Sequence, residues 1–161
     1  MSTARTYPGP RYLVANAEEG EPGVFKDRHL LENDPHLVVE GLLIAAHAVE
    51  ARQVFVYVNG EAGVASRRLE DAIAAAKEAG MAGDVAVEVR RGAGGYVCGE
   101  ESVILSSIEG ERAVPRLRPP LPVEAGLWGQ PTVINNVETL ANLPLILREG
   151  VEAFRSVGTE S

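Results

Sequence analysis

Hydrophobic and polar positions divide the chain into two kinds of segment. Short apolar runs without helical spacing predict four strands, at residues 12–15, 53–59, 85–89 and 132–134. Apolar residues spaced three and four apart predict helices at residues 34–50, 66–79, 102–108 and from 135 to about 147. The run at 53–59 is β-branched and aromatic almost throughout, which is typical of a strand buried on both faces.

Residues with capping preferences mark several of the helix ends. Asp34 followed by Pro35 predicts a helix start, and Gly80 predicts the end of the helix at 66–79. Pro144 predicts a kink in the last helix. Either Asn135 or Asn136 can cap that helix, which would leave the other amide side chain free for a ligand.

The order of these elements predicts an α/β fold. Two strand–helix–strand units follow one another, and such units place parallel strands side by side through right-handed crossovers. We therefore expect a three-layer, Rossmann-like domain with a mostly parallel sheet flanked by helices.

The segment at 112–131 departs from this pattern. It contains five prolines and little periodicity, which in a compact domain is typical of a functional or partner-binding segment. Leu127 and Trp128 are expected to anchor it to the body. The basic residues Arg112, Arg116 and Arg118 indicate either a solvated loop or a local anion or partner contact.

Composition narrows the functional classes. A chain of 161 residues can bury a real core, and a net charge of −8 argues against a nucleic-acid binder. One cysteine, Cys98, allows no intrachain disulfide and no four-cysteine cluster. His36 and His47 have no metal-binding partners at ligand spacing, so no metal site is expected. With no signal peptide and no apolar run long enough to span a bilayer, we expect a soluble, cytoplasmic protein.

Polar clusters follow the first and fourth predicted strands. Asn16 and the carboxylates of Glu18, Glu19 and Glu21 come directly after the first strand. A second cluster, at 135–139, begins the last helix. Open α/β sheets bind ligands beyond the carboxyl ends of their strands, so both clusters are candidate contacts for the polar edge of a ligand.

A third cluster is the glycine turn at 91–101. A strand, a glycine-rich turn and a helix in that order often hold a nucleotide phosphate, although this stretch alone is equally consistent with a tight turn. Glu100 and Glu101 at the helix start would repel a phosphate. They suit a ribose, an amide or a flavin ring better.

Three ordered groups of motifs resemble a single family. The first is NAEEGEPG at 16–23, with FKDR at 25–28 and DPH at 34–36. The second is RGAGGY at 91–96, with CGEE at 98–101 and IEG at 108–110. The third is PR at 115–116, PP at 119–120, GLWG at 126–129, PTV at 131–133 and NNVETLAN at 135–142. Together they resemble the NADH-oxidising, FMN-carrying subunit of respiratory complex I and the related diaphorase subunits of NAD-linked hydrogenases and formate dehydrogenases.

The resemblance implies binding of FMN and NADH, with hydride passing from NADH to FMN and electrons leaving through an iron–sulfur cluster. The residues it places around FMN are Asn16, Glu18, Glu19, Tyr96, Gly99, Glu100, Asn135, Asn136 and Thr139, the last near the phosphate end. Glu21 and Glu101 would take the catalytic positions on the nicotinamide side and orient NADH. The implied partners are the other subunits of a complex I-type or diaphorase assembly.

The sequence also departs from the family pattern. Residues 1–10 contain one glycine where the family has a glycine-rich loop that holds the FMN phosphate, and Leu121 replaces an aromatic residue that stacks on adenine. The family's ubiquitin-like domain and the cysteine-bearing domain that binds a four-iron cluster are missing from this sequence. We therefore expect a truncated flavin domain at 12–158, between a loose lead-in at 1–11 and a polar tail at 159–161, with no iron–sulfur cluster on this chain.

Two other functional classes remain open. A non-catalytic assembly or interaction module would keep the fold and lose the cofactor; the missing glycine loop favours it and the intact polar clusters oppose it. A generic nucleotide-binding domain would have a phosphate turn without carboxylates, unlike this one. Apolar surface uncovered by the missing segments would favour self-association, so a homo-oligomer is a further expectation.

Overall fold

A four-stranded, all-parallel sheet forms the centre of the molecule. A computed structural model describes residues 2–92 and 96–159. The strands are β1 (Tyr12–Ala17), β2 (Gln53–Val58), β3 (Ala86–Arg91) and β4 (Thr132–Asn136), in the spatial order β3-β2-β1-β4. All four strands run where the hydrophobic pattern predicts them.

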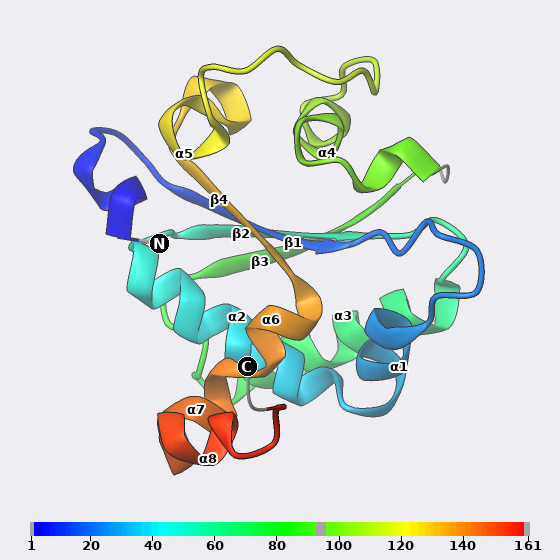
Figure 1. The fold of residues 1–161 in the computed structure, drawn as a ribbon, viewed down its shortest axis with the longest axis vertical. Coiled ribbons are helices and arrows are strands. Elements are labelled where there is room, and N and C mark those ends of the chain that lie inside the picture. The colour runs from blue at the N-terminus through cyan, green and yellow to red at the C-terminus, as the bar shows by residue number, and fades with distance from the viewer. Residues whose placement is uncertain (1, 93–95, 160–161) are drawn as a thin grey trace.

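Helices cover both faces of this sheet (Figure 1). The lower face carries α1 (Lys26–Asn33), α2 (Pro35–Val49), α3 (Gly63–Glu78) and α6 (Val137–Ala141). Below them lie α7 (Leu143–Glu149) and α8 (Val151–Arg155). The upper face carries η2 (Tyr96–Gly99), α4 (Glu101–Ile108), α5 (Pro122–Ala125) and η3 (Leu127–Gly129). The three-layer α/β architecture expected from the sequence is confirmed.

Side-chain alternation along the strands builds a separate core on each face. Leu13, Ala15 and Ala17 of β1 belong to the lower core, with α2 and α3. Val14 points the other way and joins an upper core with Phe55. By the same alternation Asn16 and Glu18 belong to the upper side, where the carboxyl ends of the strands meet the glycine turn.

The strand order creates a crevice next to β1. The chain proceeds outward from β1 to β2 and β3, then crosses the upper face and adds β4 on the opposite side of β1. At such a switch point the flanking connections diverge, and ligands of open parallel sheets bind there. The register places Asn16 of β1 directly beside Asn136 of β4.

The Pro-rich segment is anchored as expected. Leu127 is fully buried in the upper core, and the Trp128 ring lies 5.1 Å from that of Tyr12 and 5.8 Å from that of Phe55, between ring centroids. This aromatic contact holds η3 against the sheet and so fixes the approach of the chain to β4.

Helix α1 was not predicted from the sequence. Its N-cap is Phe25, which provides no side-chain hydrogen bond, so the local start signal is missing. The helix predicted from residue 135 is divided at Asn142 into α6 and α7, and Pro144 lies in the first turn of α7. The segment predicted as a loose lead-in contains a 3-10 helix, Ser2–Thr6, whose Ala4 is buried in the lower core.

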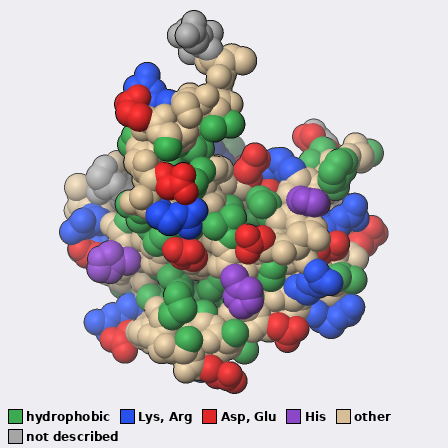
Figure 2. Space-filling model, turned by 90° about the horizontal axis from the view of Figure 1, so that it is seen from below, with side chains coloured by type: hydrophobic (Ala, Val, Ile, Leu, Met, Phe, Trp, Pro, Cys, Tyr) green, Lys and Arg blue, Asp and Glu red, His purple; other side chains and the backbone are tan. Residues whose placement is uncertain are grey.

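The surface of the helical layer carries mixed charges. Seen from below, acidic, basic and apolar side chains are interspersed over it (Figure 2). Among the described residues, no helix combines the length and the apolar character required to cross a bilayer.

Candidate functional site

A hollow of about 550 Å³ opens at the switch point. It lies beyond the carboxyl ends of β1 and β4, between the acidic loop and the glycine turn. Six predicted site residues line it, namely Asn16, Glu19, Glu21, Gly99, Glu100 and Asn136. It is also lined by Lys26, Asp27 and Val97, which the sequence analysis did not select. Residues up to 120 positions apart in the sequence thus meet around one space.

Asn16 joins the end of β1 to the glycine turn. Its Nδ2 donates to the Gly99 carbonyl oxygen at 2.9 Å, and its Oδ1 accepts from the Glu18 backbone N–H at 3.2 Å. Both ends of the amide are therefore engaged within the chain. These two hydrogen bonds hold η2 against the end of β1, and η2 forms one wall of the hollow.

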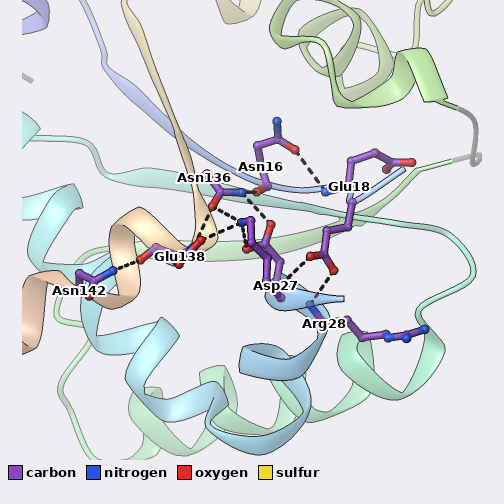
Figure 3. Close-up of polar contacts among 9 residues, drawn as sticks. Asn16, Glu18, Asp27, Arg28, Asn136, Glu138 and Asn142 are labelled. Carbon is purple, nitrogen blue, oxygen red and sulfur yellow. Dashed lines mark hydrogen bonds and ion pairs between the residues drawn. The ribbon is translucent and has the colours of Figure 1, made fainter. Parts of the chain in front are cut away.

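Asn136 joins β4 to β1 and α1 (Figure 3). Its Nδ2 donates to Asp27 Oδ2 at 2.7 Å and to the Asn16 carbonyl oxygen at 3.2 Å. Its Oδ1 accepts from Lys26 Nζ at 2.8 Å and from the Glu138 backbone N–H at 3.1 Å, which makes Asn136 the N-cap of α6. Asn136 therefore takes the capping role expected of one of the two asparagines.

Asn135 is the other asparagine that the sequence analysis selected. Its side chain is half-buried and makes no hydrogen bond within the described residues. It does not line the hollow, so its contact with a ligand stays a prediction.

Lys26 and Asp27 form an ion pair in the first turn of α1. Lys26 Nζ lies 2.7 Å from Asp27 Oδ1 and 3.1 Å from Glu138 Oε2. Partial burial opposes the charged form of Lys26, but the two carboxylates outweigh it and raise the pKa of the ammonium group. Asp27 is 2% exposed. Both residues belong to the FKDR motif at 25–28, but the sequence analysis predicted no function for their charges.

Glu19 acts as a helix cap from outside the helix. Its carboxylate accepts from the backbone N–H groups of Asp27 and Arg28, at 2.7 and 2.9 Å. These N–H groups belong to the first turn of α1, which has no capping side chain of its own. The acidic loop and α1 are thereby fastened together, and this remote cap explains why the sequence pattern missed the helix.

Replacing Glu19 by glutamine is expected to lower the free energy of unfolding by about 1 kcal/mol, because one charge-assisted cap bond becomes a weaker neutral one and the other is lost, since the amide nitrogen cannot accept from an N–H. Urea unfolding followed by circular dichroism measures this. Glu21→Gln serves as the matched control, since Glu21 is an exposed carboxylate of the same loop. Equal effects of the two substitutions would contradict the capping role.

Glu100 caps α4 and pairs with the Pro-rich segment. Its Oε2 accepts from the backbone N–H groups of Ser102 and Val103 at 2.9 and 3.0 Å. Arg118 Nη2 lies 2.7 Å from Glu100 Oε1 and 3.0 Å from Glu101 Oε2. Burial opposes ionisation of Glu100, but the hydrogen bonds from residues 102 and 103 and the charge of Arg118 lower the pKa of its carboxyl.

Arg118 belongs to the basic group that the sequence left undecided. Together with Arg116, which pairs with Glu109, it attaches the loop after α4 to carboxylates of this chain. Arg118 offsets part of the charge of the two carboxylates at the helix start, a role that the sequence analysis did not assign to it.

Glu18 lies beneath the glycine turn. Its side chain is fully buried, its Oε1 accepts one long hydrogen bond from Asn59 Nδ2 at 3.4 Å, and its Oε2 has no partner within the described residues. Desolvation raises the pKa of this carboxyl to about 7. The same burial, with the nearby Glu18 charge, raises the pKa of the Cys98 thiol.

Gly92 leaves room for this carboxyl group. A Cβ atom at Gly92 would lie 2.6 Å from Glu18 Oε2 and 2.9 Å from the Tyr57 hydroxyl, closer than atoms can approach without rearrangement. The strand ends therefore converge on Glu18 with no space for a side chain at this position.

The other predicted site residues lie outside the hollow's wall. Glu101 is held by Arg118, and Thr139 is exposed on α6. The side chain of Tyr96 lies outside the described residues. Glu21 also lines a second hollow of about 440 Å³ on the other side of the acidic loop, next to Arg28 and Asn59. The acidic loop is thus a partition between two spaces.

Residues 2–145 match the family described as the Nuo51 FMN-binding domain. The chain is 49% identical to an NADH-quinone oxidoreductase subunit of Aquifex aeolicus, a match that covers 94% of this chain and 37% of the relative. It is 51% identical to the corresponding NADH-quinone oxidoreductase subunit of Mycobacterium tuberculosis, with 94% and 36% covered.

Solved structures give the same result. The structure of an NAD⁺-reducing [NiFe]-hydrogenase in the H₂-reduced state superposes with a TM-score of 0.93 and 42% sequence identity. That match covers 98% of this chain and 28% of the hydrogenase chain. The air-oxidised state of an NAD⁺-reducing [NiFe]-hydrogenase gives a TM-score of 0.90. This chain therefore spans well under half the length of the relatives that it matches.

Proposed function

Because the chain belongs to the Nuo51 FMN-binding domain family, we propose that it provides the flavin-facing part of an NADH dehydrogenase subunit. The observation that carries this proposal is the convergence of the family's motifs. NAEEGEPG and CGEE contribute Asn16 and Glu100 to the same hollow, and NNVETLAN contributes Asn136. Relatives named as NADH-quinone oxidoreductase subunits support the same assignment.

The donor set around the hollow suits FMN. Amides, carboxylates and backbone groups are the partners that flavin ribityl hydroxyls and ring edges require. Glu18 Oε2 and the Asn135 amide have no hydrogen-bond partner within the described residues, and we infer that bound FMN supplies one; neither side chain lines the hollow itself. The residues proposed to face FMN are Asn16, Glu18, Glu19, Tyr96, Gly99, Glu100, Asn135, Asn136 and Thr139.

In the proposed mechanism the protein holds the two cofactors in position, and the reaction takes place between them. Bound FMN would supply the chemistry that accepts hydride from NADH. Glu21 and Glu101 would lie on the nicotinamide side and orient NADH by hydrogen bonds to its polar edge. Asn16 holds the glycine turn at the height set by its bond to Gly99. Arg118 would offset part of the charge of Glu100 and Glu101 next to the ligand.

The proposal places this chain in a larger electron-transfer assembly. Its relatives are subunits of a quinone oxidoreductase, and its structural neighbours are hydrogenases that reduce NAD⁺. The electrons would leave through an iron–sulfur cluster held outside this chain, by partner subunits or further domains.

A non-catalytic interaction module is the second candidate. The observation that favours it is the saturation of Asn16 and Asn136, whose polar side-chain atoms are all used within the chain. In that case the same network would serve the fold alone.

FMN titration separates the two candidates. Saturable quenching of flavin fluorescence by the purified chain is expected, with Asn135→Ala weakening the affinity about tenfold by removing the available amide. Asn33→Ala is the matched control, because Asn33 is an exposed helix residue remote from the hollow. Absence of quenching by a chain that circular dichroism shows to be folded would favour the interaction module.

A further inference from the structure

We propose that Lys26 and Asp27 are positioning residues of the flavin site, acting through Asn136 on Asn16 and the glycine turn. The inference rests on the proposed function for its ligand and on the contacts of α1 for its geometry. Neither residue is among those proposed to face FMN. Both line the hollow from the side of α1.

Asp27 is a buried carboxylate with a partner for each oxygen. A carboxylate that is 2% exposed needs partners for both oxygens, and Lys26 Nζ and Asn136 Nδ2 supply them, each at 2.7 Å. Buried ion pairs add little net stability compared with apolar residues of the same size, whereas breaking one leaves an unpaired charge. The arrangement therefore fixes geometry more than it stabilises the fold.

Hydrogen bonds link Asp27 to the glycine turn through Asn136 and Asn16. Asn136 uses one N–H for Asp27 and the other for the Asn16 carbonyl oxygen, so its amide plane cannot turn without losing a bond. Asn16 in turn holds Gly99 through its side chain. A continuous chain of hydrogen bonds thus runs from α1 through β4 and β1 to the glycine turn.

Asp27 is also linked to the acidic loop. The backbone N–H of Asp27 donates to Glu19 Oε1 at 2.7 Å, so the same residue also fixes the loop on the opposite wall of the hollow. Asp27 therefore contacts the acidic loop through its backbone and Asn136 through its carboxylate. A displacement of the carboxylate would act on Asn136 and the glycine turn, whereas the backbone bond to Glu19 does not depend on it.

The test begins with the ligand-free chain. In ¹⁵N-labelled Asp27→Asn, the side-chain amide signals of Asn136 and Asn16 and the backbone signal of Gly99 are expected to shift. Asp34→Asn is the matched control, because Asp34 caps the next helix, with Leu37 N–H as its partner, and contacts none of the site. Shifts confined to α1 in Asp27→Asn would overturn the proposal, whether or not FMN binds.

A neutral double variant separates position from charge. In Asp27→Asn the new Nδ2 faces the Lys26 ammonium, donor against donor, and FMN affinity is expected to fall about tenfold. In Lys26→Gln/Asp27→Asn a glutamine oxygen can accept from that Nδ2 and restore the network without charge. Recovery of the amide signals, and of FMN affinity and the visible circular dichroism of bound FMN, is expected. An unrecovered double variant would overturn the positioning role.

Failure of the proposed function gives a different pattern. A folded wild-type chain that binds no FMN, yet shows the amide shifts at Asn16 and Gly99 in Asp27→Asn, would keep the positioning network and reject the flavin assignment for this chain alone. Absence of these amide shifts in Asp27→Asn, together with FMN binding by the wild-type chain, would keep the flavin assignment and reject the positioning network.

Discussion

Replacing Gly41 by alanine is expected to lower the free energy of unfolding by about 3 kcal/mol, the upper part of the range for overpacking a core. Gly41 lies on the buried face of α2 against α6, and a Cβ atom there would overlap the Leu140 carbonyl oxygen. The obstacle is backbone and cannot rotate away, so α6 must move. That movement would shift Asn136, which caps α6 and forms part of the hollow's wall.

Gly63→Ala is the control for Gly41→Ala. Gly63 also lies in a helix, at the start of α3, where a Cβ atom would be 3.4 Å from the flexible Arg91 side chain. It is expected to leave stability unchanged or raise it by up to about 1 kcal/mol, from helix propensity. Urea unfolding of both variants decides the matter, and equal stabilities would show that the α2–α6 contact is not close-packed.

Replacing Glu18 by glutamine is expected to stabilise the chain by about 3 kcal/mol at pH 8 and to leave it nearly unchanged at pH 4.5. Burial raises the pKa of Glu18 from 4.5 to about 7 in the folded chain. Between these values the folded chain retains a proton that the unfolded chain releases. Wild-type stability therefore falls as the pH rises through this window, by 1.36 kcal/mol for each unit of pKa difference.

The difference between the two pH profiles isolates Glu18. Tyr57 and Cys98 face it, but burial and, to a smaller extent, the Glu18 charge raise the pKa of both groups above their ordinary values of 10.0 and 9.0, so both stay neutral between pH 4.5 and pH 8. Glu61→Gln, which replaces an exposed carboxylate near the end of β2, is the matched control for the substitution itself. A parallel profile for Glu18→Gln would mean that this carboxyl finds a partner that removes its desolvation cost.

The strands and α2 could be predicted because their signals are local. Asp34 and Pro35 start α2 by themselves, and the Leu37 N–H donates to Asp34 as expected. Helix α1 could not be predicted, since its cap is Glu19, which lies before the helix and across a loop. A cap supplied from a distance leaves no trace in the helix's own sequence.

The site shows the same division. The clusters around Asn16, Gly99 and Asn136 were predicted to meet, because parallel strands bring their carboxyl ends to one edge. The roles of Arg118 and Asp27 were not predicted, because they depend on partners far away in the sequence. A buried aspartate and an exposed one look alike in sequence, and only the burial of Asp27 and its hydrogen bond from Asn136 show which kind it is.

The strand order also determines when the site can exist. The bonds from Asn16 to Gly99 and from Asn136 to Asn16 close loops of 83 and 120 residues, whereas β1, β2 and β3 follow one another along the chain. Long closures cost more entropy and come later in folding. On the ribosome, a nascent chain that ends before residue 132 can pair three strands but has no crevice. The hollow at the switch point therefore forms only after residue 132 has been synthesised, and its appearance reports that β4 has docked.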